Sequence, residues 1–206
     1  MNEQYKVQVQ NLVDDLKAVF THAGLGGEAG EYKLLTQSFL YKFLNDKFLY
    51  EAQAVDSENT YEHLVSMSEE DYDWLLEDIG TSTAWMKPNQ FIETLHRKQN
   101  ESDFYETFEN TLNQIAVDNN DIFSVHTAKD TSIRLFDEHL ITDTIPDSSK
   151  RNEVAKSILN LLARVKFDET IFSQGFDFFS TLFEYMIKDY NKDGGGKYAE
   201  YYTPHS

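Results

Sequence analysis

The chain has 206 residues and a formal net charge of -18 at pH 7, from 36 Asp and Glu against 18 Lys and Arg. This charge opposes DNA as the main partner, because nucleic-acid surfaces neutralise phosphates with clustered Lys and Arg, and the longest basic clusters here are pairs such as Arg97-Lys98 and Lys150-Arg151. An apolar fraction of 40% with 15 Phe and 12 Tyr excludes a disordered chain and suits one domain or slightly more.

The chain contains no Cys, which excludes a disulfide framework and thiolate chemistry. Its first residues, MNEQYKVQVQ, lack the apolar core of a signal peptide, and no apolar run approaches the roughly 18 residues that a membrane span needs. We therefore expect a cytoplasmic protein without a membrane partner.

Two helices are predicted at the N-terminal end. Apolar residues recur every three or four positions over residues 5–20, and a broader apolar face covers residues 31–49. Between them, Gly24-Leu-Gly-Gly-Glu-Ala29 fits the dinucleotide fingerprint G-x-G-x-x-A, which requires a preceding strand. Because an amphipathic helix precedes it, we interpret this segment as a turn that ends the first helix.

The segment after an expected loop at residues 56–60 carries the signals of a helix start. Ser68 is a polar N-cap candidate, and residues 69–73 supply the acidic first turn that complements a helix dipole, so we expect a helix that Gly80 ends. The acidic run could instead be a metal-binding or DNA-mimicking surface, but we favour the helix-dipole interpretation. The residues expected to face inward are Trp74, Leu75 and Ile79.

The rest of the chain is also predicted to be helical. Residues 81–87 are expected to be extended before Pro88, and residues 121–146 to be irregular apart from a short helix near residues 133–137. Apolar periodicity and capping residues predict the remaining helices at residues 88–96, 102–117, 147–165 and 175–190. The fold class is therefore all-α, with an N-terminal helical bundle domain.

Common catalytic and metal-binding motifs are absent. HExxH, CxxC, GxSxG and Walker A sequences do not occur, and none of the six His residues stands four positions from another. The three prolines, Pro88, Pro146 and Pro204, are all isolated, so the chain has no Asn-Pro-Pro-aromatic methylation motif. These motifs therefore assign neither a catalytic residue nor a metal ligand.

Two separated segments carry a family resemblance. The first is EYKLLTQSFLYKFLNDKF at residues 31–48, and the second is FDFFSTLFEYMIK at residues 176–188, followed by a Gly-rich loop and Ala199-Glu-Tyr-Tyr-Thr-Pro204. Their order and approximate separation resemble those of the modification, or methyltransferase, subunit of type I restriction-modification systems. In that family the second segment opens the binding site for S-adenosyl-L-methionine.

The resemblance implies a division of the chain. Residues 1–165 would be the helical N-terminal domain, and residues 166–206 a linking helix and the start of an α/β S-adenosylmethionine-dependent methyltransferase domain, truncated before the family's Gly-rich loop and catalytic motif. Ala199 stands where Gly is common in the family, and His205 where Arg is common. Cofactor contacts are implied for Glu200, Tyr201, Tyr202, Thr203, Pro204 and His205.

The resemblance also implies a function. The chain would be the N-terminal part of a DNA adenine-N6 methyltransferase subunit that assembles with a specificity subunit, a second modification subunit and a restriction subunit, and closes around DNA. Since the catalytic motif is absent from this chain, we expect the chain alone to be inactive.

Two alternatives come from the residues themselves. The sequence DYNKDGGGKYAE at residues 189–200 satisfies the EF-hand calcium pattern, although Gly196 replaces the usual aliphatic residue at position eight and Pro204 opposes the helix that should follow. The calcium pattern places its ligands at Asp189, Asn191, Asp193 and Glu200, with Gly194 at the sharp turn.

The second alternative is an acidic DNA-mimic or interaction protein, which the net charge alone suggests.

Overall fold

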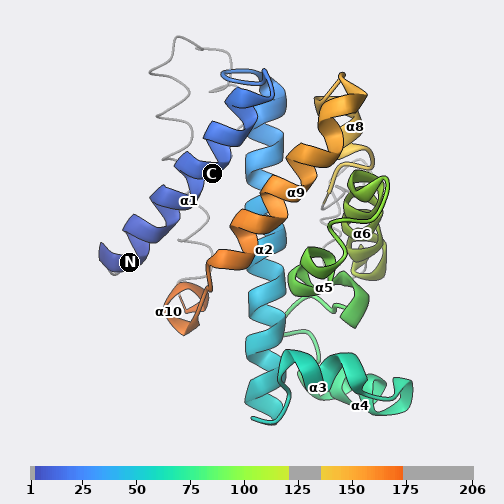
Figure 1. Ribbon diagram of the computed structural model, residues 1–206. Helices are drawn as coiled ribbons and strands as arrows, with labels where there is room; N and C mark the ends of the chain where they lie inside the picture. The colour runs from blue at the N-terminus through green and yellow to red at the C-terminus, as the bar shows by residue number, and fades with distance from the viewer. Residues whose placement is uncertain (1–2, 121–135, 174–206) are drawn as a thin grey trace, which may run out of the picture.

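The computed structural model describes residues 3–120 and 136–173, and within these two ranges it contains helices and connecting segments but no strand. The helices surround one long helix, α2 (Ala29–Val55), against which α1, α4, α8 and α9 all pack (Figure 1). The expected all-α class is thus confirmed for the described residues. No helix in these ranges has the length and apolar character needed to cross a membrane.

Helix α1 (Glu3–His22) is joined to α2 by the glycine turn that the sequence predicted. Gly24 and Gly27 have positive φ angles of 88° and 76°, a conformation that glycine adopts without steric cost. The Gly27 N–H donates to Glu31 Oε2 over 2.7 Å, which fixes the turn on the first turn of α2. The buried face of α1 consists of Val9, Leu12, Val13, Leu16 and Phe20.

Helices α3 (Tyr61–Ser66) and α4 (Glu69–Ile79) form an arm at the C-terminal end of α2 (Figure 1). Ser68 caps α4 by accepting a hydrogen bond from Asp71 N, and Gly80 ends it, as predicted. The prediction for Trp74 was wrong, because 62% of this residue is exposed, whereas Leu75 and Ile79 are buried.

Tyr72 takes the inward position that was assigned to Trp74. Its ring stacks on Phe48 of α2 with 6.4 Å between centroids, and its hydroxyl donates to the backbone oxygen of Met86 over 2.5 Å. Because α4 packs on α2 through the side that carries Tyr72, Leu75 and Ile79, the side that carries Trp74 faces outward.

The helix expected at residues 88–96 is split in two. The 3-10 helix η1 (Pro88–Gln90) and α5 (Ile92–Arg97) are separated by Phe91, which has an extended backbone and a fully buried ring. Helix α6 (Phe104–Asp118) follows, close to the bounds predicted for it.

The last described helices are α8 (Leu140–Thr144), α9 (Ser148–Arg164) and α10 (Glu169–Phe172). Asp147 caps α9 as predicted, and α9 packs on α1, α5 and α6. The expectation of a helix up to residue 137 was wrong for its described part: Phe136 is buried without helical structure, and Asp137 N donates to Gln37 Oε1 over 2.9 Å. The helix predicted at residues 175–190 lies outside the described residues.

Candidate functional site

The residues assigned to cofactor binding from the sequence lie outside the part of the chain that the structure describes. This holds for Glu200, Tyr201, Tyr202, Thr203, Pro204 and His205, and equally for the calcium pattern at residues 189–200. Within residues 3–120 and 136–173, no group of three or more His, Asp or Glu side chains is placed to hold a metal ion. The described residues offer other features, among them a pocket.

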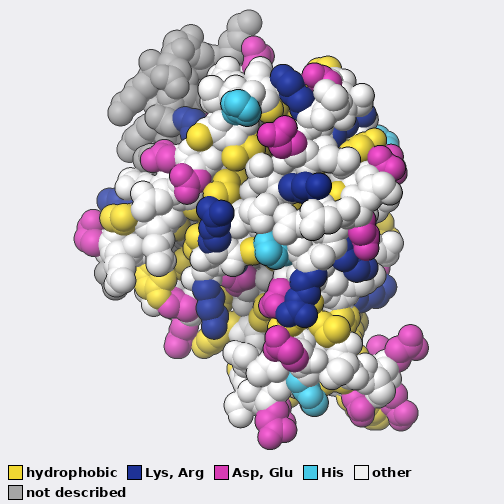
Figure 2. Space-filling view, in the orientation of Figure 1, with side chains coloured by type: hydrophobic (Ala, Val, Ile, Leu, Met, Phe, Trp, Pro, Cys, Tyr) yellow, Lys and Arg dark blue, Asp and Glu magenta, His cyan; other side chains and the backbone are white. Residues whose placement is uncertain are grey.

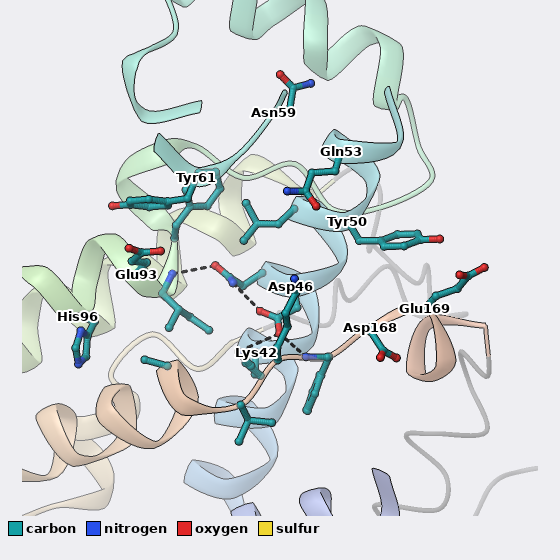
Figure 3. A pocket seen from close by; sticks show the side chains of 18 of the residues that line it. Lys42, Asp46, Tyr50, Gln53, Asn59, Tyr61, Glu93, His96, Asp168 and Glu169 are labelled. Atoms are coloured by element: carbon teal, nitrogen blue, oxygen red, sulfur yellow. Dashed lines mark hydrogen bonds and ion pairs between the residues drawn. The ribbon is translucent and has the colours of Figure 1, made fainter. Parts of the chain in front are cut away.

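The pocket lies between α2, α5 and the segment that joins α9 to α10 (Figure 3). Its volume is about 820 Å³, large enough for a small molecule or for a few side chains of a partner. Tyr50 and Gln53 of α2 line one side, Tyr61 and His96 another, and Asp168 stands at the start of α10. Both polar and aromatic side chains therefore face this space.

A buried ion pair forms the floor of the pocket. Lys42 Nζ lies 2.9 Å from Asp46 Oδ2, and their side chains are only 5% and 7% exposed. Asp46 also accepts hydrogen bonds from Asn45 Nδ2 (2.9 Å) and from the backbone N–H of Phe167 (2.8 Å). Three donors thus surround the carboxylate, an arrangement that satisfies a buried charge and does not leave a free general base.

Burial lowers the pKa of Lys42, and the neighbouring Asp46 carboxylate opposes this shift by favouring the charged ammonium. The ammonium also lies 5.9 Å from the centre of the Phe167 ring, at the outer limit of a cation–π contact. Asp46 thus favours the charged form of Lys42, and the pair acts as a joint between α2 and the α9–α10 segment.

Asn45 extends this joint to a third element. Its Oδ1 accepts from the backbone N–H of Ile92 over 2.9 Å, at the start of α5, while its amide donates to Asp46. The adjacent Asn45 and Asp46, which lie near the end of the first family-like segment, thus bind backbone groups from two distant parts of the chain. The sequence did not indicate this role, because an i,i+4 Lys–Asp pair is usually an exposed helix pair.

The outer edge of the pocket connects α5 to α9. His96 Nε2 and Asn160 Oδ1 are 2.8 Å apart, and Asn160 Nδ2 donates to Gln99 Oε1 over 3.0 Å. These two contacts lie on either side of Arg97 and Lys98 in the sequence and bring that basic pair beside α9.

A basic strip results, which we define as Lys98, Lys156, Arg164 and Lys166. Figure 2 shows Lys and Arg side chains gathered over α5 and α9, although the chain as a whole is strongly acidic. No described carboxylate forms an ion pair with any member of the strip. The sequence contained a partial signal, since Lys156, Asn160 and Arg164 follow one another at four-residue spacing along a single helix face.

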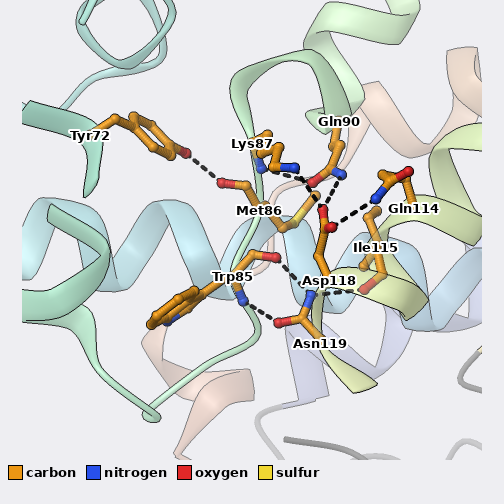
Figure 4. A network of polar contacts seen from close by, with 9 residues as sticks. All are labelled: Tyr72, Trp85, Met86, Lys87, Gln90, Gln114, Ile115, Asp118 and Asn119. Atoms are coloured by element: carbon orange, nitrogen blue, oxygen red, sulfur yellow. Dashed lines mark hydrogen bonds and ion pairs between the residues drawn. The ribbon is translucent and has the colours of Figure 1, made fainter. Parts of the chain in front are cut away.

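A second polar network holds the extended segment before η1 (Figure 4). Asn119 is buried, and its side chain accepts from Trp85 N (2.7 Å) and donates to the oxygens of Trp85 (2.8 Å) and Ile115 (2.9 Å). Asn119 thereby satisfies backbone groups that a neighbouring strand would otherwise satisfy. All these contacts are internal, so we interpret the network as structural.

Asp118, next to Asn119, completes this network. Partial burial opposes its ionisation, but hydrogen bonds from Gln114 and Gln90 and the ammonium of Lys87 outweigh burial and lower the pKa of its carboxyl group. Asp118 is therefore charged at neutral pH and ties α6 to η1.

Comparisons with known proteins gave no match: no family model, curated protein or solved structure is similar to this chain.

Proposed function

We propose that the chain is the N-terminal part of the DNA adenine-N6 methyltransferase subunit of a type I restriction-modification system, and that its helical part mediates subunit assembly and closure around DNA. The proposal rests on the resemblance of residues 31–48 and of the segment from residue 176 to Pro204 to that family. S-adenosyl-L-methionine would bind at Glu200 to His205 together with residues of a complete catalytic domain. It would supply the methyl group.

The observation that best supports this proposal is the joint at Asp46. The first family-like segment is the buried core of α2, and its Asn45-Asp46 end holds Phe167, which precedes the second family-like segment by nine residues. A hydrogen-bonded buried charge fixes this exit point of the chain relative to α2. If a partner subunit displaced the helical body, the segment that leads to Glu200 to His205, which we call the cofactor strip, would be displaced with it.

The basic strip supports a limited contact with DNA. Its four cations could neutralise only a few phosphates, so most of the DNA affinity would have to come from other subunits, in keeping with the net charge of -18. A duplex bound through about four phosphates should show a logarithmic salt slope near -3.6.

Two experiments test the proposal. The coding sequence beyond Ser206 should contain a Gly-rich strand–turn segment and an Asn-Pro-Pro-aromatic motif within a few hundred residues, and their absence would refute the family assignment. The chain alone, incubated with labelled S-adenosylmethionine and unmethylated DNA, should transfer no methyl group above background. Sequence-dependent transfer by the pure chain would show that the catalytic residues were misjudged.

The alternatives predict different observations. An acidic DNA mimic requires a continuous ridge of carboxylates, whereas the face in Figure 2 mixes Asp and Glu with the basic side chains over α5 and α9. A calcium-binding protein requires ligands at residues 189–200, and binding studies can test that pattern directly.

A further inference from the structure

Trp74 is the most exposed of the large apolar side chains in the described residues, with 62% of its surface accessible. It lies on the outward side of α4, because the buried residues of that helix are on the other side. Helix α4 belongs to the arm at the end of α2 (Figure 1). Its exposure is not a sign of a loosely held helix, because Tyr72, Leu75 and Ile79 of the same helix are buried and Ser68 caps its N-terminus. A rigid helix therefore presents a large aromatic ring to the exterior.

On its own helix, this ring is flanked by acidic residues. Residues three and four positions away are neighbours on a helix surface, and for Trp74 all four such residues carry exposed carboxylates. Figure 2 shows Asp and Glu side chains gathered over this arm. The four flanking residues are Glu70, Asp71, Glu77 and Asp78.

Part of this charge arrangement works against the stability of α4. The helix contains six acidic residues and no basic one, and Glu77 and Asp78 occupy its last turn, where the helix dipole disfavours negative charge. Glu69, Asp73 and Glu77 also repel one another at four-residue spacing. Among the described residues no ion pair relieves these carboxylates. A cationic partner would offset both the unfavourable interaction with the helix dipole and the repulsion between the carboxylates.

The ring determines which kind of cation fits. An indole face attracts Arg guanidinium and Lys ammonium groups, and carboxylates at its edge add charge-assisted hydrogen bonds that a guanidinium can meet in a planar geometry. DNA and RNA would be repelled. A metal ion would gain nothing from the indole, and no metal-binding cluster occurs in the described residues.

We propose that the outward face of α4, formed by Trp74 and its flanking carboxylates, docks a basic peptide segment of a partner protein, with an arginine or lysine side chain placed over the indole. This interaction is independent of the family assignment, since it uses neither the cofactor strip nor the basic strip.

The proposal can be tested by fluorescence anisotropy with a labelled peptide of six Arg-Gly repeats and the full chain. We expect saturable binding that Trp74→Ala weakens by about fivefold or more and that Trp74→Phe largely retains, because phenylalanine keeps an aromatic face. The double variant Glu77→Gln/Asp78→Asn should weaken binding by about threefold or more. Far-ultraviolet circular dichroism should show that these substitutions at exposed positions leave the helix content unchanged.

Two matched controls separate this surface from general attraction. Asp14→Asn/Asp15→Asn removes the same charge from the exposed side of α1, and Val117→Ala shortens another exposed apolar residue, so both should bind within about twofold of the unaltered chain.

Three results would overturn the proposal. The first is that Trp74→Ala binds the peptide as tightly as the unaltered chain does. The second is that Asp14→Asn/Asp15→Asn weakens peptide binding as much as Glu77→Gln/Asp78→Asn does. The third is that the peptide does not bind at all. Sedimentation without peptide provides a further check. Self-association that Trp74→Ala abolishes would identify the occupant as a second copy of this chain and would also refute a basic partner.

Discussion

Replacement of Asp46 by Asn tests the joint on which the proposed function depends. Asn can still accept from the Phe167 N–H through its side-chain oxygen, so the main change is loss of the negative charge beside Lys42. Because the Lys42 side chain is only 5% exposed, its ammonium would be left buried without a counter-charge. Removal of one partner of a buried pair costs about 3–5 kcal/mol, and we expect the lower part of this range because one hydrogen bond survives.

Urea unfolding followed by far-ultraviolet circular dichroism measures this loss. With a slope of about 2 kcal/mol per M, a loss of about 3 kcal/mol lowers the unfolding midpoint by about 1.5 M. The control is Lys42→Met/Asp46→Asn, which removes both charges and keeps an acceptor for Phe167. This double variant should lose only about 1–2 kcal/mol, since no buried charge remains unpaired.

Either of two results would refute this role of the buried Lys42–Asp46 pair. One is a midpoint for Asp46→Asn within about 0.5 M of the unaltered chain, which would mean that water reaches Lys42 freely. The other is a double variant no more stable than Asp46→Asn, which would assign the loss to hydrogen bonds instead of the unpaired charge.

Three further predictions follow from the polar contacts and from the sequence. Asn119→Ala should lower the free energy of unfolding by about 2–3 kcal/mol, because it leaves backbone groups of Trp85 without partners. The control Asn100→Ala, at an exposed site, should change this free energy little, and thermal melting distinguishes the two variants. Burial raises the pKa of Tyr72. The neutral Tyr72 hydroxyl therefore contributes its full stability below pH 10, and this contribution declines as the pH rises from 10 toward the raised pKa. Tyr72→Phe should make the alkaline loss of stability shallower, as measured by urea unfolding at pH of about 9 and 11. Calcium at a hundredfold excess over a sensor-like dissociation constant would stabilise an EF-hand by roughly 2.7 kcal/mol. For this chain we expect no calcium binding in calorimetric titration and no stabilisation in thermal melting. Micromolar calcium binding that is lost in Glu200→Gln would support the calcium alternative instead.

The long helices could be predicted because each contains enough residues to show its period. Those that became α1, α2, α4, α6 and α9 all have 11 residues or more, and their starts were marked by capping residues such as Ser68 and Asp147. Helices α3, α8 and α10 have only four to six residues, too few to repeat an apolar spacing, so they were not predicted.

The orientation of α4 shows where periodicity fails. Two apolar stripes can be drawn through its 11 residues, one with Trp74 and one with Tyr72, and both include Leu75 and Ile79. Only the positions of Phe48 and the Met86 carbonyl, which contact Tyr72, determine which stripe is buried. The exposed Trp74, and with it the proposed docking surface, therefore could not be obtained from the sequence.

The sequence by itself determined that the described part of this protein is helical, since apolar spacing and caps are properties of neighbouring residues. Only the tertiary structure decided that Lys42 and Asp46 are buried, that Lys98 lies beside α9, and that a pocket opens above the ion pair. The physical reason is distance along the chain. Asp46 and Phe167 are separated by 121 positions, and their hydrogen bond exists because α2, α5 and α9 pack together, not because of any pattern within one helix.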